Sequence, residues 1–196
     1  MKLKNTKIVI IAVSILCIVA TLICLVFLLQ QPEDRLSEEQ IAALRAEYPI
    51  RTTLYPPYVN VMYPSLETTK KIAASFVYAE VIKVEIVAER EDCTFCDYTF
   101  SVIDDTRNKL KKGEKIVFSD GTRDGIYTIP LLKEGMKIVF PVMKHESEDQ
   151  YQYMKGCEYY VTDDGYVMSA FDEERAEVTP PLSGIKLKKL MRELKK

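Results

Sequence analysis

The chain has 196 residues, enough for one domain or at most two, and its 27 basic and 29 acidic side chains give a formal net charge of −2. Residues 30–196 carry 24 of the basic and all 29 acidic side chains, so this part has a net charge of −5. The negative sum argues against nucleic acid as a partner, and the alternation of aromatic and β-branched residues with charges excludes disorder for most of this part.

Residues 8–29 are predicted to form a transmembrane helix. This run of 22 residues is apolar except at Ser14, Thr21 and two cysteines. At about 1.5 Å per residue it gives roughly 33 Å of helix, which is enough to cross the hydrocarbon core. The run exceeds the apolar core of a cleaved signal peptide, which favours an uncleaved signal-anchor. The charged residues before the run are all lysines, so residues 1–7 should be a cytoplasmic stub and the C-terminal part of this single-pass cell-membrane protein should be extracellular.

Residues 30–74 are predicted to be a helical and proline-rich approach segment. Ser37 and Gln40 have the spacing of a capping box, which predicts a short helix that ends at Pro49. Residues 51–64 contain three prolines and should be extended and irregular. Ser65 can then cap a second short helix that runs through Ala74.

From residue 75 to residue 172 the hydrophobic period changes to two, which predicts a β-rich ectodomain. Asp164-Gly165 is a hairpin signal between its last two strands. Several short strands after a small helix predict a mainly β (α+β) fold, with a small closed antiparallel barrel and flanking short helices. The expected strands are 76–87, 97–103, 114–119, 126–129, 136–143, 158–162 and 166–171.

The order of these segments resembles bacterial, Gram-positive-like surface proteins that are membrane-anchored and carry an oligonucleotide/oligosaccharide-binding (OB)-like or netrin-like barrel. The outline is also similar to metalloproteinase-inhibitor modules. The resemblance covers residues 76–171 and implies a barrel that binds a partner. It is carried by Phe-Val-Tyr-Ala-Glu-Val at 76–81, Tyr-Thr-Phe-Ser-Val at 98–102, Lys-Lys-Gly at 111–113 and the segment 130–140.

Residues 173–196 are predicted to be a linker followed by a basic amphipathic helix that starts at Ser183. Leu187, Leu190, Met191 and Leu194 recur on one side of this helix, and six basic residues against Glu193 occupy the rest. One interpretation is that the apolar stripe docks on the barrel and the basic side is simply solvated. The other is that the basic side binds anionic lipid headgroups or anionic wall polymer, with Lys188, Lys189 and Arg192 among the binding residues.

Three cysteines and the single histidine form a candidate metal site. Cys93 and Cys96 have the Cys-x-x-Cys spacing that supplies two zinc ligands from a tight turn, and His145 and Cys157 could complete a tetrahedral set. The alternative is one disulfide among Cys93, Cys96 and Cys157, which the outer side of a membrane permits. We favour the disulfide and no cofactor, without choosing the pairing.

Tyrosine is abundant, with 12 residues against no tryptophan, and it suits wet recognition surfaces. Tyr55 and Tyr58 in the proline-rich segment, and Tyr151, Tyr153 and Tyr159 near the last strands, could form a sugar- or peptide-binding face. The competing interpretation is that tyrosines on strands fill the barrel core and its rim.

These features favour a non-enzymatic module, tethered to the membrane through residues 8–29, that binds a protein or glycan partner in the cell envelope or outside the cell. No Gly-x-Ser-x-Gly elbow is present, and a catalytic triad would have to use His145. The alternative hypothesis is a zinc-stabilised or thiol-active protein that uses Cys93, Cys96 and Cys157.

Overall fold

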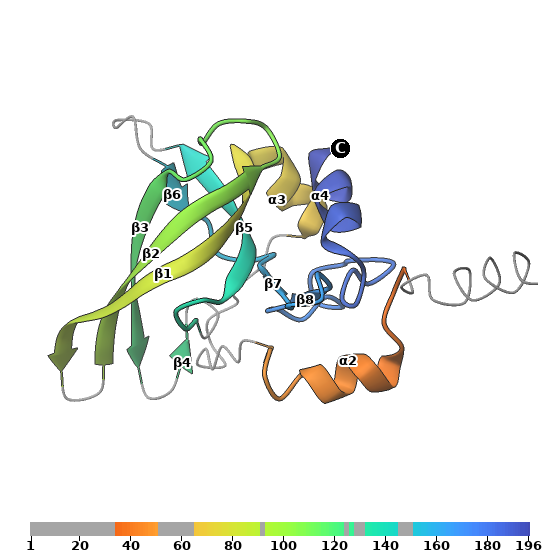
Figure 1. Ribbon diagram of the computed structural model, residues 1–196, viewed down its shortest axis with the longest axis horizontal. Helices are drawn as coiled ribbons and strands as arrows, with labels where there is room; N and C mark the ends of the chain where they lie inside the picture. The colour runs from red at the N-terminus through yellow and green to blue at the C-terminus, as the bar shows by residue number, and fades with distance from the viewer. Residues whose placement is uncertain (1–33, 51–64, 91–92, 124–125, 128–131, 145–150) are drawn as a thin grey trace, which may run out of the picture. The chain divides into compact units, whose positions relative to one another are not determined.

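The computed structural model describes residues 34–50, 65–90, 93–123, 126–127, 132–144 and 151–196 (Figure 1). The chain divides into two compact units at residue 34, and the helices and strands below all belong to the second unit, Arg35–Lys196. Among the described residues no helix is long and apolar enough to span a membrane. The predicted stub and transmembrane helix, residues 1–29, and the proline-rich residues 51–64 lie outside the described residues.

The second unit is built around one antiparallel sheet, in the strand order β4-β3-β2-β1-β5-β7-β8, with β6 also paired to β5. The mainly β prediction is confirmed, and most strands lie within a few residues of their expected positions. The short β6 was not predicted. The strands are β1 (Ser75–Arg90), β2 (Cys93–Asp105), β3 (Lys115–Arg123), β4 (Ile126–Tyr127), β5 (Lys137–Lys144), β6 (Tyr151–Tyr153), β7 (Tyr159–Val161) and β8 (Val167–Ser169).

The predicted closed barrel is not formed, because the described part of the sheet is open. β1 covers one edge of β5, and the other edge is divided between β7 at residues 137–139 and β6 at residues 142–144. No hydrogen-bonded pairing between the described residues of β6 and β3 closes the ring. The two strands meet only through side chains, with the rings of Phe118 and Tyr153 5.4 Å apart between centroids.

Two hydrophobic cores share the strands β1 and β5. In β1, Val77 belongs to the first core and Phe76 to the second; in β5, Phe140 belongs to the first and Val139 to the second. Since neighbouring residues of a strand point to opposite faces, the cores lie on the two sides of the sheet. The first core contains packed aromatic rings, among them Phe100, Phe118 and Phe140, and the second core is covered by helices α3 and α4.

In the described part of the chain, three helices flank the sheet: α2 (Glu38–Leu44), α3 (Leu66–Ile72) and α4 (Leu187–Lys195). The predicted caps are confirmed. The hydroxyl of Ser37 accepts from Gln40 N while the Gln40 side chain accepts from Ser37 N, and the hydroxyl of Ser65 accepts from Thr68 N. α2 ends before Pro49, and the chain continues through a turn in which Tyr48 N donates to Leu44 O at 2.9 Å. An N-cap fixes the first residue of a helix, whereas the last residue is defined less sharply.

The basic helix begins at Leu187 rather than at the predicted Ser183, because residues 184–186 form extended pairings. Ile185 is bridged to Arg35, and Leu36 N donates to Gly184 O at 2.8 Å. Gly184 has a φ of +82°, and a Cβ built there would lie 2.7 Å from Ile41 Cδ1. The start of the second unit is therefore joined to the residues directly before α4.

Arg45 fixes the end of α2 to the same region. Its guanidinium donates to Ser169 O at 2.6 Å, to Ser169 Oγ at 3.1 Å and to Ser183 Oγ at 3.2 Å. Burial lowers the pKa of Arg45, and the negative charge of Glu173 partly opposes that shift. Charge-assisted bonds of this kind stabilise the position of α2 against β8.

A buried carboxylate, Asp105, organises the loop between β2 and β3. It accepts from the backbone N–H groups of Arg107 at 3.0 Å, Lys109 at 2.5 Å and Leu110 at 2.7 Å, and from the hydroxyl of Ser75. Every partner is a structural group of the loop or of β1. This carboxylate is therefore used for folding, because its hydrogen-bonding capacity is filled by the protein itself.

Candidate functional site

Strands β1, β2 and β3 extend together past the N-terminal end of β5, which begins at Lys137, and form a projecting arm (Figure 1). The arm is defined here as residues 82–90, 93–99 and 117–123. β1 pairs with β5 only as far as Glu80, opposite Lys137. Val81 still makes backbone hydrogen bonds to Gly135 and Met136, both at 2.8 Å, and from Ile82 onward the described residues of β1 pair with β2 alone. The arm therefore has one long edge, along β1, with no described strand beside it.

Apolar side chains are exposed along this edge. Ile82 is 38% exposed, Ile86 is 62% exposed and Val87 is 54% exposed. The pairing of β1 with β2 shifts register between Val81 and Lys83 and again between Ile86 and Ala88. Each shift is a β-bulge, which adds a residue to β1 and changes which face the following side chains occupy. The bulges leave apolar side chains at the surface that a regular alternation would have buried or replaced by charges.

The position of these bulges could have been inferred from the sequence. From Glu80 to Glu89, apolar residues of β1 alternate with charges except at the pair Val81-Ile82 and at the run Ile86-Val87-Ala88. The two register shifts beyond Glu80 fall at these two positions. The sequence prediction identified the strand and its charged residues but did not use the doubled apolar residues, which are the signal that it missed.

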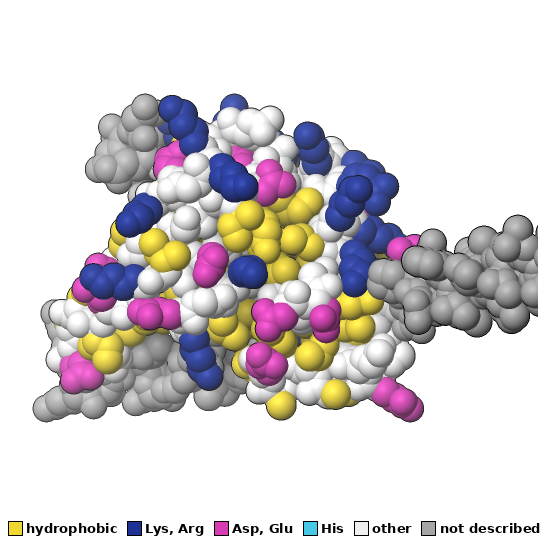
Figure 2. All heavy atoms as spheres, viewed as in Figure 1, with side chains coloured by type: hydrophobic (Ala, Val, Ile, Leu, Met, Phe, Trp, Pro, Cys, Tyr) yellow, Lys and Arg dark blue, Asp and Glu magenta, His cyan; other side chains and the backbone are white. Residues whose placement is uncertain are grey.

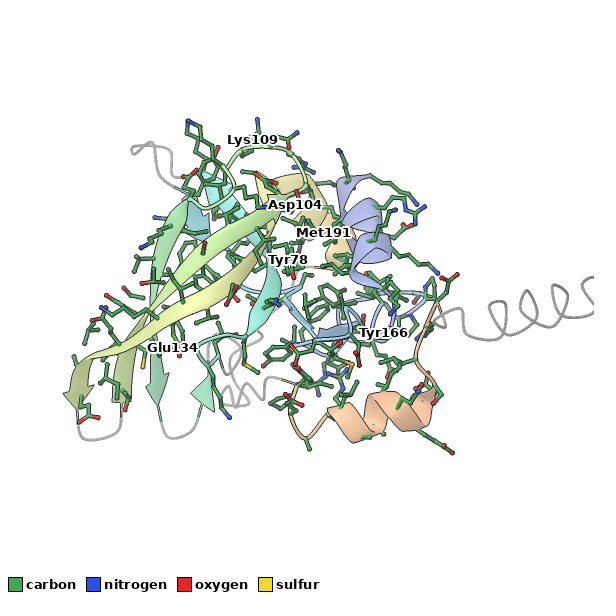
Figure 3. The ribbon with its side chains drawn as sticks, viewed as in Figure 1. Tyr78, Asp104, Lys109, Glu134, Tyr166 and Met191 are labelled. Atoms are coloured by element: carbon green, nitrogen blue, oxygen red, sulfur yellow. The ribbon has the colours of Figure 1, made fainter. Side chains whose placement is uncertain are left out.

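The start of the edge is occupied and its far part is open. Val84 N donates to Glu134 Oε1 at 3.2 Å, and Figure 3 shows Glu134 beside β1, close to where β5 begins. Lys83 Nζ lies 2.7 Å from Glu85 Oε1, so these two charges are paired within the strand. From Glu85 to Glu89 no described strand covers the edge. Such an edge presents backbone N–H and C=O groups that can pair with another extended chain.

The tyrosines proposed for a binding face are mainly part of the cores. Tyr159 is completely buried and packs edge-on against Phe171 at 5.2 Å, so its ring offers no surface to a ligand. Burial also raises the pKa of Tyr159 above its usual range. Tyr153 stacks on Phe140 at 5.1 Å, and its hydroxyl donates to Glu158 Oε1 at 3.0 Å.

The other predicted tyrosines do not make a continuous face. Tyr151 is half-buried and borders a groove beside β3, whereas Tyr55 and Tyr58 lie outside the described residues. For the described tyrosines, the core-filling interpretation therefore accounts for more of the rings than a binding face does.

The candidate cysteines are not gathered into one site. Cys96 is a buried free thiol in the first core, whereas Cys157 lies in the second core and its thiol donates to Thr69 Oγ1 at 3.5 Å. No disulfide therefore joins these two residues, and they cannot bind one metal ion together.

The Cys-x-x-Cys pair also differs from its prediction, because Cys93 and Cys96 both lie in β2 rather than in a tight turn. A strand rises about 3.3 Å per residue, which separates their Cα atoms by about 10 Å, beyond the usual span of a disulfide. His145 lies outside the described residues. Among the described residues no group of three or more His, Cys, Asp or Glu side chains could hold a metal ion.

The basic helix α4 has the amphipathic arrangement that the sequence predicts. Leu190 and Leu194 are completely buried in the second core, and Leu187 and Met191 pack against it. The predicted docking of the apolar stripe is confirmed. The basic side chains Lys188, Lys189, Arg192, Lys195 and Lys196 are exposed.

Surface grooves beside these elements mix charges of both signs. A groove of about 330 Å³ between α3 and α4 is lined by three glutamates (Glu67, Glu177 and Glu193), by Lys70 and Lys189, and by mainly apolar residues. Another of about 550 Å³ beside β3 is lined by Lys109, Glu114 and neighbouring residues. Neither concentrates one kind of chemistry, so the open edge of the arm and the basic side of α4 are the more distinctive surfaces.

No protein-family model matches the chain, and neither a curated protein nor a solved structure shows significant similarity to it. The fold and these two surfaces are therefore the basis for assigning a function.

Proposed function

We propose that the chain is a non-enzymatic, membrane-tethered module that binds an extended segment of an extracellular or cell-envelope protein along the arm. The observation that carries the proposal is the open edge of β1 from Glu85 to Glu89, with Ile86 and Val87 exposed beside it. Protein edges of this length are normally covered or blocked, and an exposed apolar one is a template for pairing. Backbone hydrogen bonds would supply affinity, and the apolar side chains would supply selectivity.

The tether rests on the composition of the N-terminal residues. The apolar residues 8–29 are long enough to cross a bilayer, and the lysines before them favour a cytoplasmic N-terminus. The second unit would then lie outside the cell membrane, where protein segments of the envelope are available to the arm.

The strand order supports an OB-like class for the sheet. β1 pairs with β2 and β5, β2 pairs with β3, and β5 pairs with β6. The contact between the rings of Phe118 and Tyr153 brings β3 and β6 together, without hydrogen-bonded pairing between their described residues. OB folds are five-stranded and partly open, so an open seam fits this class better than it fits a fully closed barrel. Such folds commonly serve as binding scaffolds, which agrees with a non-enzymatic function.

Blocking the edge with lysines should abolish partner binding. The full chain, in lipid nanodiscs, is used to select binders from a displayed library of random linear peptides, and their affinities are measured by fluorescence polarisation. The double change Ile86→Lys and Val87→Lys should weaken the selected peptides at least tenfold, because lysines on an edge strand oppose pairing. Amide hydrogen exchange should show that a bound peptide protects residues 85–89.

Val117→Lys is the matched control for this experiment. Val117 is 55% exposed on the same arm, but it lies in β3, two strands from the β1 edge. This change should leave peptide affinity within twofold of the original. Peptides that bind the double variant as well as they bind the unmodified chain, or that lose affinity only with Val117→Lys, would contradict the proposal.

A further inference from the structure

Helix α4 is fixed so that its basic side faces solvent. Leu190 and Leu194 are completely buried against the sheet, and Met191, labelled in Figure 3, lies along the same apolar side. Because this stripe is already packed, it cannot insert into a membrane. Any contact of α4 with another surface must therefore use its charged side.

The basic side of α4 is continuous, and opposing charges lie at its border, where Glu67 and Glu177 line the groove next to Lys189. Lys188, Arg192 and Lys195 are spaced four and three residues apart, so they lie on one side of the helix, with Lys189 next to them. The single acidic residue of α4, Glu193, is already paired with Lys196 at 2.7 Å. On the face shown in Figure 2, Lys and Arg side chains gather over α4.

The position of two of these lysines adds to the argument. Lys188 and Lys189 lie in the first turn of α4, which contains no acidic residue. The helix dipole places partial positive charge at this end, so cations there oppose helix stability. Helix stability alone would favour acidic residues at these positions, whereas an anionic ligand would stabilise the lysines.

The start of the second unit lies beside the start of α4. Arg35 is bridged to Ile185, two residues before Leu187. Only residues 30–34 separate Arg35 from the end of the apolar run, and the six Cα–Cα steps from Leu29 to Arg35 span at most about 22 Å. If residues 8–29 cross the bilayer, the covalent connection alone keeps Arg35 within about 22 Å of the end of the membrane helix.

We propose that the basic side of α4 binds the anionic phospholipid headgroups of the membrane in which the chain is tethered. The inference rests on the proposed tether and names a second interaction surface, separate from the arm. Each lysine or arginine near a negative surface adds to the attraction, which decays over a Debye length of about 8–10 Å. Four cations on one side of a docked helix therefore form an electrostatic contact without apolar insertion.

Lysine accessibility tests this contact on the full chain. The chain is placed in nanodiscs of phosphatidylcholine alone or with about one-third phosphatidylglycerol, and brief acetylation by a water-soluble ester is measured at each lysine by mass spectrometry. Lys188, Lys189 and Lys195 should react at least threefold more slowly in the anionic discs, and 0.5 M salt should remove the difference. Lys111 and Lys112, exposed in the loop between β2 and β3, are the internal reference and should not change.

Two variants with equal charge loss locate the effect. Changing Lys188, Lys189, Arg192 and Lys195 to Gln should abolish the enrichment of phosphatidylglycerol that co-purifies with the chain. The same change at Lys109, Lys111, Lys112 and Lys115 should preserve that enrichment. Equal acetylation in both discs, protection of Lys111 and Lys112 as well, or protection by an anionic wall polymer alone in neutral discs would each overturn the proposal.

Failure of the tether gives a different result. A chain that does not co-elute with nanodiscs contradicts the tether itself. The same chain is then mixed with vesicles of the two compositions, where low-salt binding to the anionic vesicles alone, lost in the α4 variant, would support the lipid contact. Absence of that binding would overturn it.

Discussion

Replacing Leu190 by alanine is expected to lower the free energy of unfolding by about 2–5 kcal/mol. Leu190 is completely buried in the second core, where α4 covers the sheet. Removing its side chain leaves a cavity in addition to the lost transfer free energy. Denaturant unfolding of the full chain in mild detergent, followed by tyrosine fluorescence, measures the change, since the chain has 12 tyrosines and no tryptophan.

Leu187→Ala is the control, because it makes the same chemical change on the same helix at a position that is only partly buried. It should cost less than half as much as Leu190→Ala. Equal losses for the two variants would contradict the deeper burial of Leu190, and a negligible loss for Leu190→Ala would show that the helix is not docked.

Asp105→Asn is expected to cost about 3 kcal/mol of stability, because a hydrogen bond to a charged group contributes about 1.5–3 kcal/mol and an amide NH2 cannot accept one. The Oδ2 atom of Asp105 accepts from Lys109 N at 2.5 Å and from Leu110 N at 2.7 Å. With asparagine, one carboxylate oxygen is replaced by a donor, so N–H groups of the loop lose their acceptor. The same denaturant experiment measures the loss.

The neighbouring Asp104 supplies the control. Asp104 is exposed, and its Oδ1 accepts from Asp105 N at 2.8 Å, a bond that an asparagine oxygen can keep. Asp104→Asn removes the same charge one residue away and should change stability by less than about 0.5 kcal/mol. If Asp104→Asn destabilises the chain as much as Asp105→Asn does, net charge rather than loop hydrogen bonding is responsible.

Local sequence signals predicted the elements of this fold well. The caps at Ser37 and Ser65, the alternation in the second half of β1 and the continuous apolar run of β5 depend on neighbouring residues, so a single sequence reveals them. The prediction was less accurate where partners distant in the sequence decide the structure. Residues 184–186 are extended because Arg35 and Tyr166 pair with them, and no local pattern indicates that.

The candidate sites show the same division. The basic side of α4 follows from helical spacing and was predicted in full, with Lys188, Lys189 and Arg192. The cysteine site was predicted from spacing alone, but Cys96 and Cys157 pack on opposite sides of the sheet. The open edge of β1 depends on where β5 stops, which is a tertiary property, although the doubled apolar residues in β1 were a local sign of it.

The sharing of β1 and β5 between the two cores has a thermodynamic consequence. Val77 and Phe76 are adjacent in β1 and enter different cores, as do Phe140 and Val139 in β5. Loss of either core would expose one face of the strands on which the other is built. Neither half can therefore melt by itself, and the second unit should lose its structure in a single cooperative transition. The two proposed binding surfaces, the arm and the basic side of α4, should then be lost in the same unfolding transition.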